Sequence, residues 1–148
     1  IGIAAEKSGS ATGRIRMKHL KSREASEIQG FITTFIEPGA TIISDRHKSY
    51  PTIVQKGYIH DPQKKPYFWE EVDGDDERLL PRVHRATSLL KRWYYGTYQG
   101  RVHKKNLQSY LDEFVFRFNR RTSGHRGLVF HRMVEAAVHS KPKPRPSR

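Results

Sequence analysis

The chain of 148 residues contains no cysteine. This absence excludes disulfide bonds, thiolate zinc sites and cysteine nucleophiles together. The sequence also lacks a run of about 18 apolar residues, the length that a membrane-spanning helix needs. No charged and then apolar leader opens it, so an obvious secretion signal is missing too. We therefore expect a cytoplasmic protein.

Acidic residues are scarce in the second half of the chain. Residues 1–76 hold 11 Lys or Arg and 11 Asp or Glu, whereas residues 77–148 hold 17 and 4. The whole net charge of +13 therefore belongs to the second half. This asymmetry indicates a polyanionic partner, with nucleic acid as the leading candidate. A ribosomal RNA-binding protein would also be basic, but it would rarely combine this asymmetry with a patterned apolar core in both halves.

The length is that of one domain with a proper core, which we place at residues 1–139. The Pro-rich basic tail, residues 140–148, should be disordered. Residues 1–5 (IGIAA) read as a buried strand with no initiator methionine before them. We expect that the natural N-terminus has been removed or that an upstream part of the fold is missing.

The first half alternates strands with helices. Its hydrophobic pattern predicts strands at residues 1–6, 14–20, 41–44 and 58–60, and helices at residues 22–36 and 52–56. A Gly- and Ser-rich turn, residues 8–13, joins the first two strands into a hairpin, and Ser22 should cap the first helix. Strands packed between helices predict an α/β layer fold with a mixed sheet.

Residues 61–77 lose this periodicity and carry a cluster of acidic side chains, Glu70, Glu71, Asp73, Asp75 and Asp76. Two interpretations are open, a mobile acidic loop and a metal-binding loop. The spacing of a calcium-binding EF-hand, with Gly at position 6 and Glu at position 12, is not met. We favour the mobile loop.

The second half predicts helices. The first begins at Pro81 and has an apolar stripe, Val83, Ala86, Leu90 and Trp93. His84 and Lys91 are seven residues apart, so they share another face about 10 Å from each other. An imidazole and an ammonium among Arg82, Arg85 and Arg92 suggest a surface that meets phosphate. A solvated basic helix is the alternative.

Two more helices should follow. The first has an apolar face, Leu107, Tyr110, Leu111, Phe114 and Phe118, with Asn106 as N-cap and Arg117, Arg120 and Arg121 near its C-terminal end. The last, Val129 to His139, should use its apolar side chains for packing, namely Met133, Val134, Ala137 and Val138.

Asp45 follows the predicted strand 41–44, at the carboxyl end where α/β sheets bind ligands. A lone aspartate there is most often a turn-former or a cap. Phosphoryl transfer with two metal ions needs several oxygen ligands near both ions. One carboxylate cannot hold such a pair, so Asp45 would need partners.

Four segments carry a resemblance to a known family: residues 13–17 (GRIRM), EPG followed by SD at Asp45, residues 80–100 (LPRVHRATSLLKRWYYGTYQG) and residues 110–121 (YLDEFVFRFNRR). They resemble the transposases of bacterial insertion sequences, more narrowly the ISXO-type group of DDE transposases. The resemblance extends from residue 1 to about Val138. It implies an RNase H-like fold without its first strand, a helical basic C-terminal half, and DNA cleavage and strand transfer that depend on Mg²⁺ or Mn²⁺. It also implies transposon-end and target DNA as partners, a homodimer or larger assembly on DNA, and a bacterial, nucleoid-associated protein.

The resemblance also implies roles for single residues. Asp45 matches the family's second metal ligand and His84 the third, where relatives carry Glu, Asn or His. Lys91 matches a DNA-contacting lysine or arginine. The first aspartate of the family would precede residue 1, and Glu6 is not its counterpart. Since histidine suits Mn²⁺ better than Mg²⁺ and one carboxylate is missing, we expect the chain alone to be inactive.

Two hypotheses follow. In the first, the chain is a transposase catalytic domain with Asp45, His84 and Lys91 at its site. Its DNA backbone contacts would then be Arg85, Lys91, Arg92, Lys104, Lys105, Arg117, Arg120 and Arg121. In the second, it is a non-catalytic, basic DNA-binding remnant of a transposase.

Side chains near this site have open interpretations. His47 and Lys48 either touch the substrate or form a solvated turn. Trp93 should pack in the core, while one or two of the tyrosines Tyr94, Tyr95 and Tyr98 could stack on unpaired bases at a transposon end.

Overall fold

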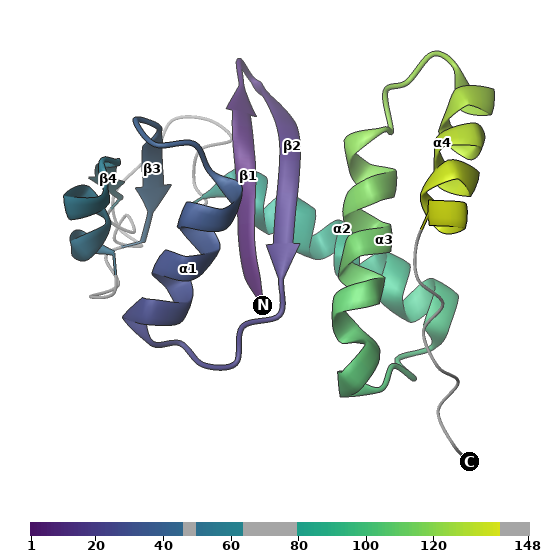
Figure 1. Ribbon diagram of the computed structural model, residues 1–148, viewed down its shortest axis with the longest axis horizontal. Coiled ribbons are helices and arrows are strands. Elements are labelled where there is room, and N and C mark those ends of the chain that lie inside the picture. The colour runs from purple at the N-terminus through teal and green to yellow at the C-terminus, as the bar shows by residue number, and fades with distance from the viewer. Residues whose placement is uncertain (46–49, 64–79, 140–148) are drawn as a thin grey trace, which may run out of the picture.

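The computed structural model describes residues 1–45, 50–63 and 80–139. Its strands are β1 (Gly2–Ser8), β2 (Ala11–Lys18), β3 (Thr41–Ser44) and β4 (Ile59–Pro62). Its helices are α1 (Ala25–Phe35), α2 (Pro81–Tyr98), α3 (Leu107–Asn119) and α4 (Arg126–His139), with short 3₁₀ turns η1 (Pro51–Lys56) and η3 (Lys104–Asn106) (Figure 1). The predictions for the acidic cluster at residues 70–76 and for the tail fall outside these residues.

The predicted hairpin is confirmed. β1 and β2 pair antiparallel, with Gly2 opposite Lys18 and Ser8 opposite Ala11. The strands reach further than predicted because the turn needs only Gly9 and Ser10, and Gly9 adopts a positive φ of 55° that suits glycine. Most of the predicted linker is therefore strand.

The mixed sheet is confirmed only in part. β3 and β4 pair parallel, with Thr41 opposite Ile59. Among the described residues this pair and the hairpin form two separate two-stranded sheets. In Figure 1 the strands follow one another as β4, β3, β1 and β2, with α1 in front of them. The architecture is mixed α/β.

Two apolar clusters hold these layers together. The first joins the hairpin to α2 and α3 through Ile15, Met17, Ala86, Leu90, Leu111, Phe114 and Phe118. The second joins α1 to η1 through Phe31, Ile32, Ile53 and Tyr58. The predicted apolar faces of α2 and α3 are thus confirmed. Gly2 allows β1 to approach α1, since a Cβ there would lie 3.2 Å from the Phe31 ring.

Helix α3 occupies the outer edge of β2 with polar side chains. Asn119 accepts a hydrogen bond from the Ile15 N–H (2.7 Å) and donates one to the Ile15 carbonyl (3.0 Å). Three turns earlier, Gln108 accepts from the His19 N–H (2.8 Å). A strand edge needs partners for its backbone groups, and here side chains from a helix supply them.

Helix boundaries differ from the prediction in two places. Ser22 does not cap α1; its hydroxyl accepts from the Glu24 N–H, and Glu24 is the N-cap residue. Asn106 does stand at the N-cap of α3, but its side chain makes no capping bond.

Helix α4 begins at Arg126 instead of Val129, and its apolar residues are not buried as predicted: Met133, Val134 and Val138 remain 48%, 42% and 75% exposed. No helix in the described ranges is long and apolar enough to cross a membrane.

Candidate functional site

Helix α2 presents the predicted cationic face. Pro81 stands at its start, where a missing N–H costs nothing, and the buried side chains of Ala86 and Leu90 fix its orientation on the hairpin. That orientation leaves His84, Arg85, Lys91 and Arg92 exposed. The seven-residue spacing of His84 and Lys91 therefore spans two turns of one regular helix, as predicted.

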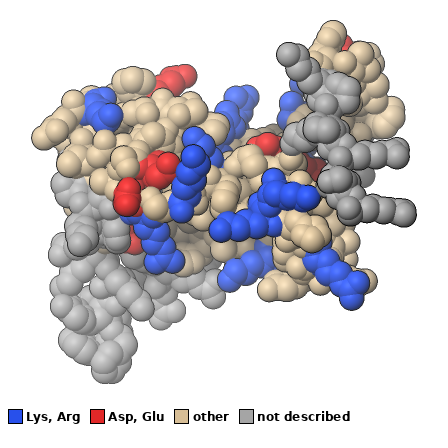
Figure 2. Space-filling view, turned by 60° about the horizontal axis from the view of Figure 1, so that its bottom comes forward, with Lys and Arg blue, Asp and Glu red and all other residues tan. Residues whose placement is uncertain are grey.

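Five of the cations predicted to contact DNA share two properties. Each is exposed, and each has no side-chain hydrogen bond or ion pair within the described residues: Arg85, Lys91, Arg92, Lys104 and Lys105. They belong to α2 and η3. Figure 2 shows Lys and Arg side chains across the centre and right of one face of the molecule. Cations without internal partners are available to phosphate.

The three arginines of the α3 end are engaged within the protein. Arg117 pairs with Glu113 one turn earlier (2.9 Å). The Arg120 guanidinium lies 3.7 Å from the centre of the Phe116 ring, and that of Arg121 lies 4.0 Å from the Phe118 ring. Their predicted DNA contacts stay predictions.

Arg121 also holds the hairpin. It donates hydrogen bonds to the carbonyls of Thr12, Gly13 (3.4 Å) and Phe118 (2.9 Å). Arg82 of α2 also bonds the hairpin, because it donates to the carbonyls of Gly9 (2.8 Å) and Ala11 (3.1 Å). Two guanidinium groups, one from α2 and one from the turn that follows α3, therefore fix the hairpin turn.

Asp45 lies exposed at the carboxyl end of β3, where the sequence predicted it. Partial burial of the Tyr50 phenol, and then the negative charge of Asp45, raise the pKa of Tyr50 above 10.0. The carboxylate of Asp45 therefore acts on the half-buried phenol of Tyr50 and disfavours its ionisation. The predicted substrate contacts His47 and Lys48 fall outside the described residues.

Beside Asp45 lies a Ser–His pair that the sequence did not reveal. The Ser44 hydroxyl donates to the Asp45 carbonyl (2.8 Å) and lies 2.8 Å from Nε2 of His60. Because the hydroxyl proton is already used, the network assigns the proton of this contact to Nε2. A serine nucleophile needs a histidine that accepts its proton, and Ser44 is only 3% exposed. The pair therefore stabilises the end of β3 and does not activate Ser44.

The donors available for a metal ion are few. Within the described ranges, no three Asp, Glu or His side chains come together as a metal site. Asp61 is a further carboxylate near Asp45 that the sequence did not predict as a site residue. It lies on β4 opposite Ile43, and Ile43 precedes Asp45 by two residues. Mg²⁺ is usually bound by one or two carboxylates together with waters and substrate phosphates. A pair of such ions needs more ligands than Asp45 alone supplies.

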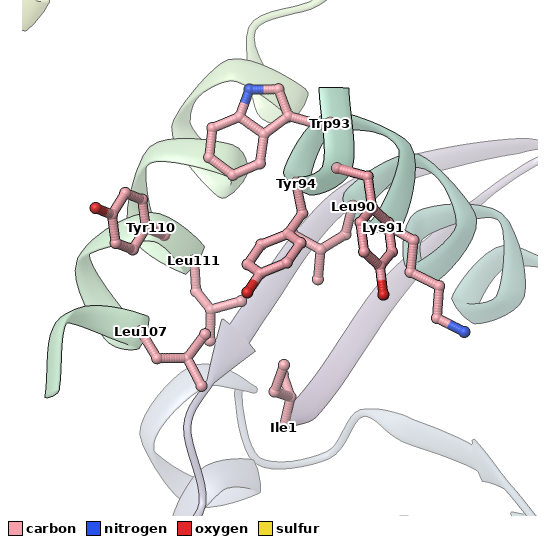
Figure 3. Close-up of a pocket in the computed structure, with 9 residues that line it drawn as sticks. Ile1, Leu90, Lys91, Trp93, Tyr94, Leu107, Tyr110 and Leu111 are labelled. Carbon is pink, nitrogen blue, oxygen red and sulfur yellow. The ribbon is translucent and has the colours of Figure 1, made fainter. Parts of the chain in front are cut away.

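A pocket of about 290 Å³ lies between α2 and α3, next to Lys91. Its walls are apolar and aromatic, and include Leu90, Trp93, Tyr94, Tyr95, Leu107 and Leu111. In Figure 3 the Tyr94 ring points toward Leu107 and Leu111, while the Lys91 side chain extends outward. An aromatic pocket beside a cation is compatible with a nucleobase and its phosphate.

The aromatic residues around this pocket divide into two kinds. The Trp93 ring lies 5.6 Å from Phe114 and 5.1 Å from Tyr98, so Trp93 packs as predicted. Tyr95 is 66% exposed, whereas the Tyr94 hydroxyl donates to the Gly100 carbonyl (2.9 Å). Of the tyrosines, Tyr95 is therefore the most accessible to a base.

Tyr98 joins the two helices. Its hydroxyl donates to Glu113 (3.0 Å), and its ring contacts Tyr110 with centroids 4.6 Å apart. Partial burial and then the hydrogen bond to the Glu113 carboxylate raise the pKa of Tyr98 above 10.0. Glu113 thus bonds both Tyr98 and Arg117.

No curated protein and no solved structure matches the chain. The family model for the ISXO2-like transposase domain matches residues 1–119, which include β1 to α3 and all the residues of the cationic face. The chain therefore belongs to the family of ISXO2-like transposase domains.

Proposed function

We propose that this transposase domain binds DNA along the exposed face of α2 and η3. The observation that carries the proposal is the set of five exposed cations that have no side-chain partner among the described residues, in a chain that belongs to a transposase family. Phosphate contacts from such side chains position a protein on DNA without reading its sequence. Lys91 would lie at the centre, with Tyr95 available to an unpaired base beside it.

The RNase H-like fold is part of the proposal. Its support is the strand order β4, β3, β1, β2, in which one pair is parallel and the other antiparallel. A further strand between β3 and β1, antiparallel to β1, would join the two pairs into one mixed sheet. In the ISXO-type transposases that the sequence resembles, that strand also carries a catalytic aspartate.

We further propose that Asp45 and His84 supply two of the metal ligands of a complete transposase. Within the described residues no group of three Asp, Glu or His side chains comes together, so in this proposal a further carboxylate completes the site before DNA is cleaved. The second candidate function is a DNA-binding domain without catalysis, and an experiment must separate the two.

The experiment measures DNA nicking with Mn²⁺ for the chain alone and for a polypeptide extended upstream by the aspartate-bearing strand. We expect nicking only in the extended form. In that form Asp45→Asn should abolish nicking and leave the DNA affinity within about twofold, because the substitution removes a ligand but adds no phosphate contact. If the extended wild type binds DNA and never nicks it, the non-catalytic alternative is correct.

A control separates DNA binding from the site at Asp45. Ser88→Ala alters an exposed neutral residue of α2 between His84 and Lys91. It should leave both nicking and affinity unchanged. A loss of affinity in Ser88→Ala equal to that in Lys91→Ala would contradict the proposed role of the cations.

A further inference from the structure

Residues 14–23 (RIRMKHLKSR) carry a run of cations that the neutral total of the first half conceals. The segment holds five Lys or Arg and no Asp or Glu, although residues 1–76 together have no net charge. It forms the second part of β2 and the loop before α1, inside the range that matches the family. None of its five cations is among the residues predicted to contact the DNA backbone, which all lie between residues 85 and 121.

Three of these cations share one face of β2. Ile15 and Met17 are buried in the cluster that joins the hairpin to α2 and α3. Successive side chains of a strand point to opposite faces, so Arg14, Arg16 and Lys18 lie on the face turned away from α2. Arg14 is exposed and the other two are half-buried. We call these three residues the β2 cation row.

The row is not paired with acidic side chains. Within the part of the chain that the structure describes, none of its three cations forms an ion pair with Asp or Glu. Glu6 instead accepts a hydrogen bond from the Arg14 backbone N–H (2.9 Å). The Arg16 side chain donates to the carbonyl of its neighbour Ile15 (3.1 Å) and keeps further guanidinium donors. The charges of the row are therefore available to an anion.

The residues opposite the row are small and neutral. On β1, Ala4 lies opposite Arg16 and Gly2 lies opposite Lys18, so neither cation has a charged cross-strand partner. Side chains two residues apart are separated by about 7 Å along a strand, and the row extends over about 13 Å. One strand of a DNA duplex presents about four phosphates over that length. The row therefore suits a phosphate backbone.

The row and the cations of α2 lie on opposite sides of the hairpin. In Figure 1 α2 crosses behind β1 and β2, whereas β2 stands between α1 and α3 with no helix in front of it. Figure 2 views this front side from below and shows Lys and Arg side chains across its centre. Ala86 and Leu90 turn one face of α2 toward the hairpin. Lys91 and Arg92 lie at least about 100° around the helix from these two residues.

This arrangement limits what one duplex can contact. A helix with its side chains is about 10–12 Å across, and the hairpin adds to the distance between the two sets of cations. A straight duplex that lies along the outer face of α2 therefore cannot also contact the β2 cation row.

We propose that the β2 cation row binds the backbone of a second DNA segment, so that one copy of the domain holds two duplexes at once. DNA is the partner because the chain belongs to a transposase family, and strand transfer joins two DNA segments. The resemblance implies both DNA partners but assigns no surface to the second. The inference rests on the proposed function, because it places the first duplex on α2 and η3.

The first test asks whether a duplex fixed to beads captures a second, fluorescent duplex through the full chain. We expect the wild type to capture it. The double variant Arg14→Ala/Lys18→Ala removes two phosphate contacts, so capture should fall at least about tenfold and its salt dependence should become shallower by about two charges. Arg16 is kept because it also bonds a backbone carbonyl. Affinity for the first duplex should stay within about twofold, since the cations of α2 and η3 are unchanged.

Two controls separate the row from net charge and from folding. Lys56→Ala/Arg132→Ala removes two exposed cations of η1 and α4, the same change in net charge, and should leave capture within about twofold of wild type. Arg14→Lys/Lys18→Arg keeps the charges of the row and should capture as the wild type does. Circular dichroism of each variant checks that it folds.

The contrary outcomes are distinct. A wild type that binds one duplex but captures no second one overturns this inference and leaves the proposed function standing, whereas a wild type that binds no DNA overturns both. Capture that persists in Arg14→Ala/Lys18→Ala would mean that two copies bridge the duplexes through α2. An equal loss in Lys56→Ala/Arg132→Ala would show an effect of net charge alone, and either result overturns the role of the row.

The second test counts duplexes per chain. A duplex of about 12 base pairs is about 40 Å long, enough to cover the row. Sedimentation of the complex in an excess of this duplex should give two duplexes per chain for the wild type and one for Arg14→Ala/Lys18→Ala. A wild-type complex with one duplex per chain, whatever its oligomeric state, would overturn the proposal.

Discussion

The cations of α2 and η3 differ from the arginines of α3, although the sequence presents them as one basic half. Arg85, Lys91 and Arg92 are exposed and have no side-chain partner within the described residues. Arg117 pairs with Glu113, and Arg121 bonds three backbone carbonyls. The positive charge is therefore divided between a surface available for binding and groups that hold the fold.

This difference separates two effects of a positive charge, on DNA affinity and on stability, which the net charge alone does not distinguish. A guanidinium bonded to backbone carbonyls must break those hydrogen bonds before it can contact a phosphate. The free energy lost with these bonds weakens its contribution to DNA binding. A solvated lysine pays mainly side-chain entropy. We therefore expect α2 to dominate DNA affinity and α3 to dominate stability.

The largest effect should come from Arg121→Ala. The substitution removes bonds from a charged group to the Thr12, Gly13 and Phe118 carbonyls, so the free energy of unfolding should fall by about 2 kcal/mol. Urea unfolding with an unchanged m-value would measure this loss. Arg85→Ala on α2 should stay within about 0.5 kcal/mol of wild type. Equal stability losses in the two variants would remove the distinction.

A smaller effect is expected for DNA binding in Lys91→Ala. Loss of one phosphate contact should weaken binding about fivefold and make the dependence of affinity on salt shallower by about one charge. The control is Arg117→Ala, which removes a cation already paired with Glu113 and should change the affinity less. Fluorescence anisotropy at several salt concentrations measures both. A larger change in Arg117→Ala would reverse the comparison.

The smallest effect should be a dependence on pH at the contact between α2 and α3. Because the folded-state pKa of Tyr98 is raised above 10.0, folding favours the neutral phenol. Its contribution to stability is full below pH 10 and is lost as the pH rises through the raised pKa. Tyr98→Phe should therefore lose less stability than wild type when unfolding is measured above pH 10. Parallel losses in both proteins would show that Tyr98 is not responsible.

Several elements could be predicted from the sequence because their signals are local. Alternating residues before and after a Gly–Ser turn predicted the hairpin, and apolar residues at helical spacing predicted the buried faces of α2 and α3. Asp45 follows β3 as expected. The exposure of His84 and Lys91 followed from the same helical period.

Other features could not be predicted, because they depend on residues far apart in the chain. Asn119 bonds Ile15 across 104 positions, and no pattern in the sequence marks an asparagine that completes a strand edge. The apolar stripe of α4 looked like a core face, since periodicity shows that a face is apolar but not whether the same chain covers it. The contact between Ser44 and His60 depends on the register of β3 and β4.

The sequence by itself determined which segments form helices and strands, though not their ends, that the positive charge belongs to the second half, and which family the chain resembles. Those properties depend on composition and on spacing along one segment. Only the tertiary structure decided which cations are available to phosphate and which hold the hairpin. A guanidinium is engaged within the protein only when carbonyls from another element lie within hydrogen-bond distance. It also decided that α4 keeps its apolar stripe exposed, because burial requires a second surface.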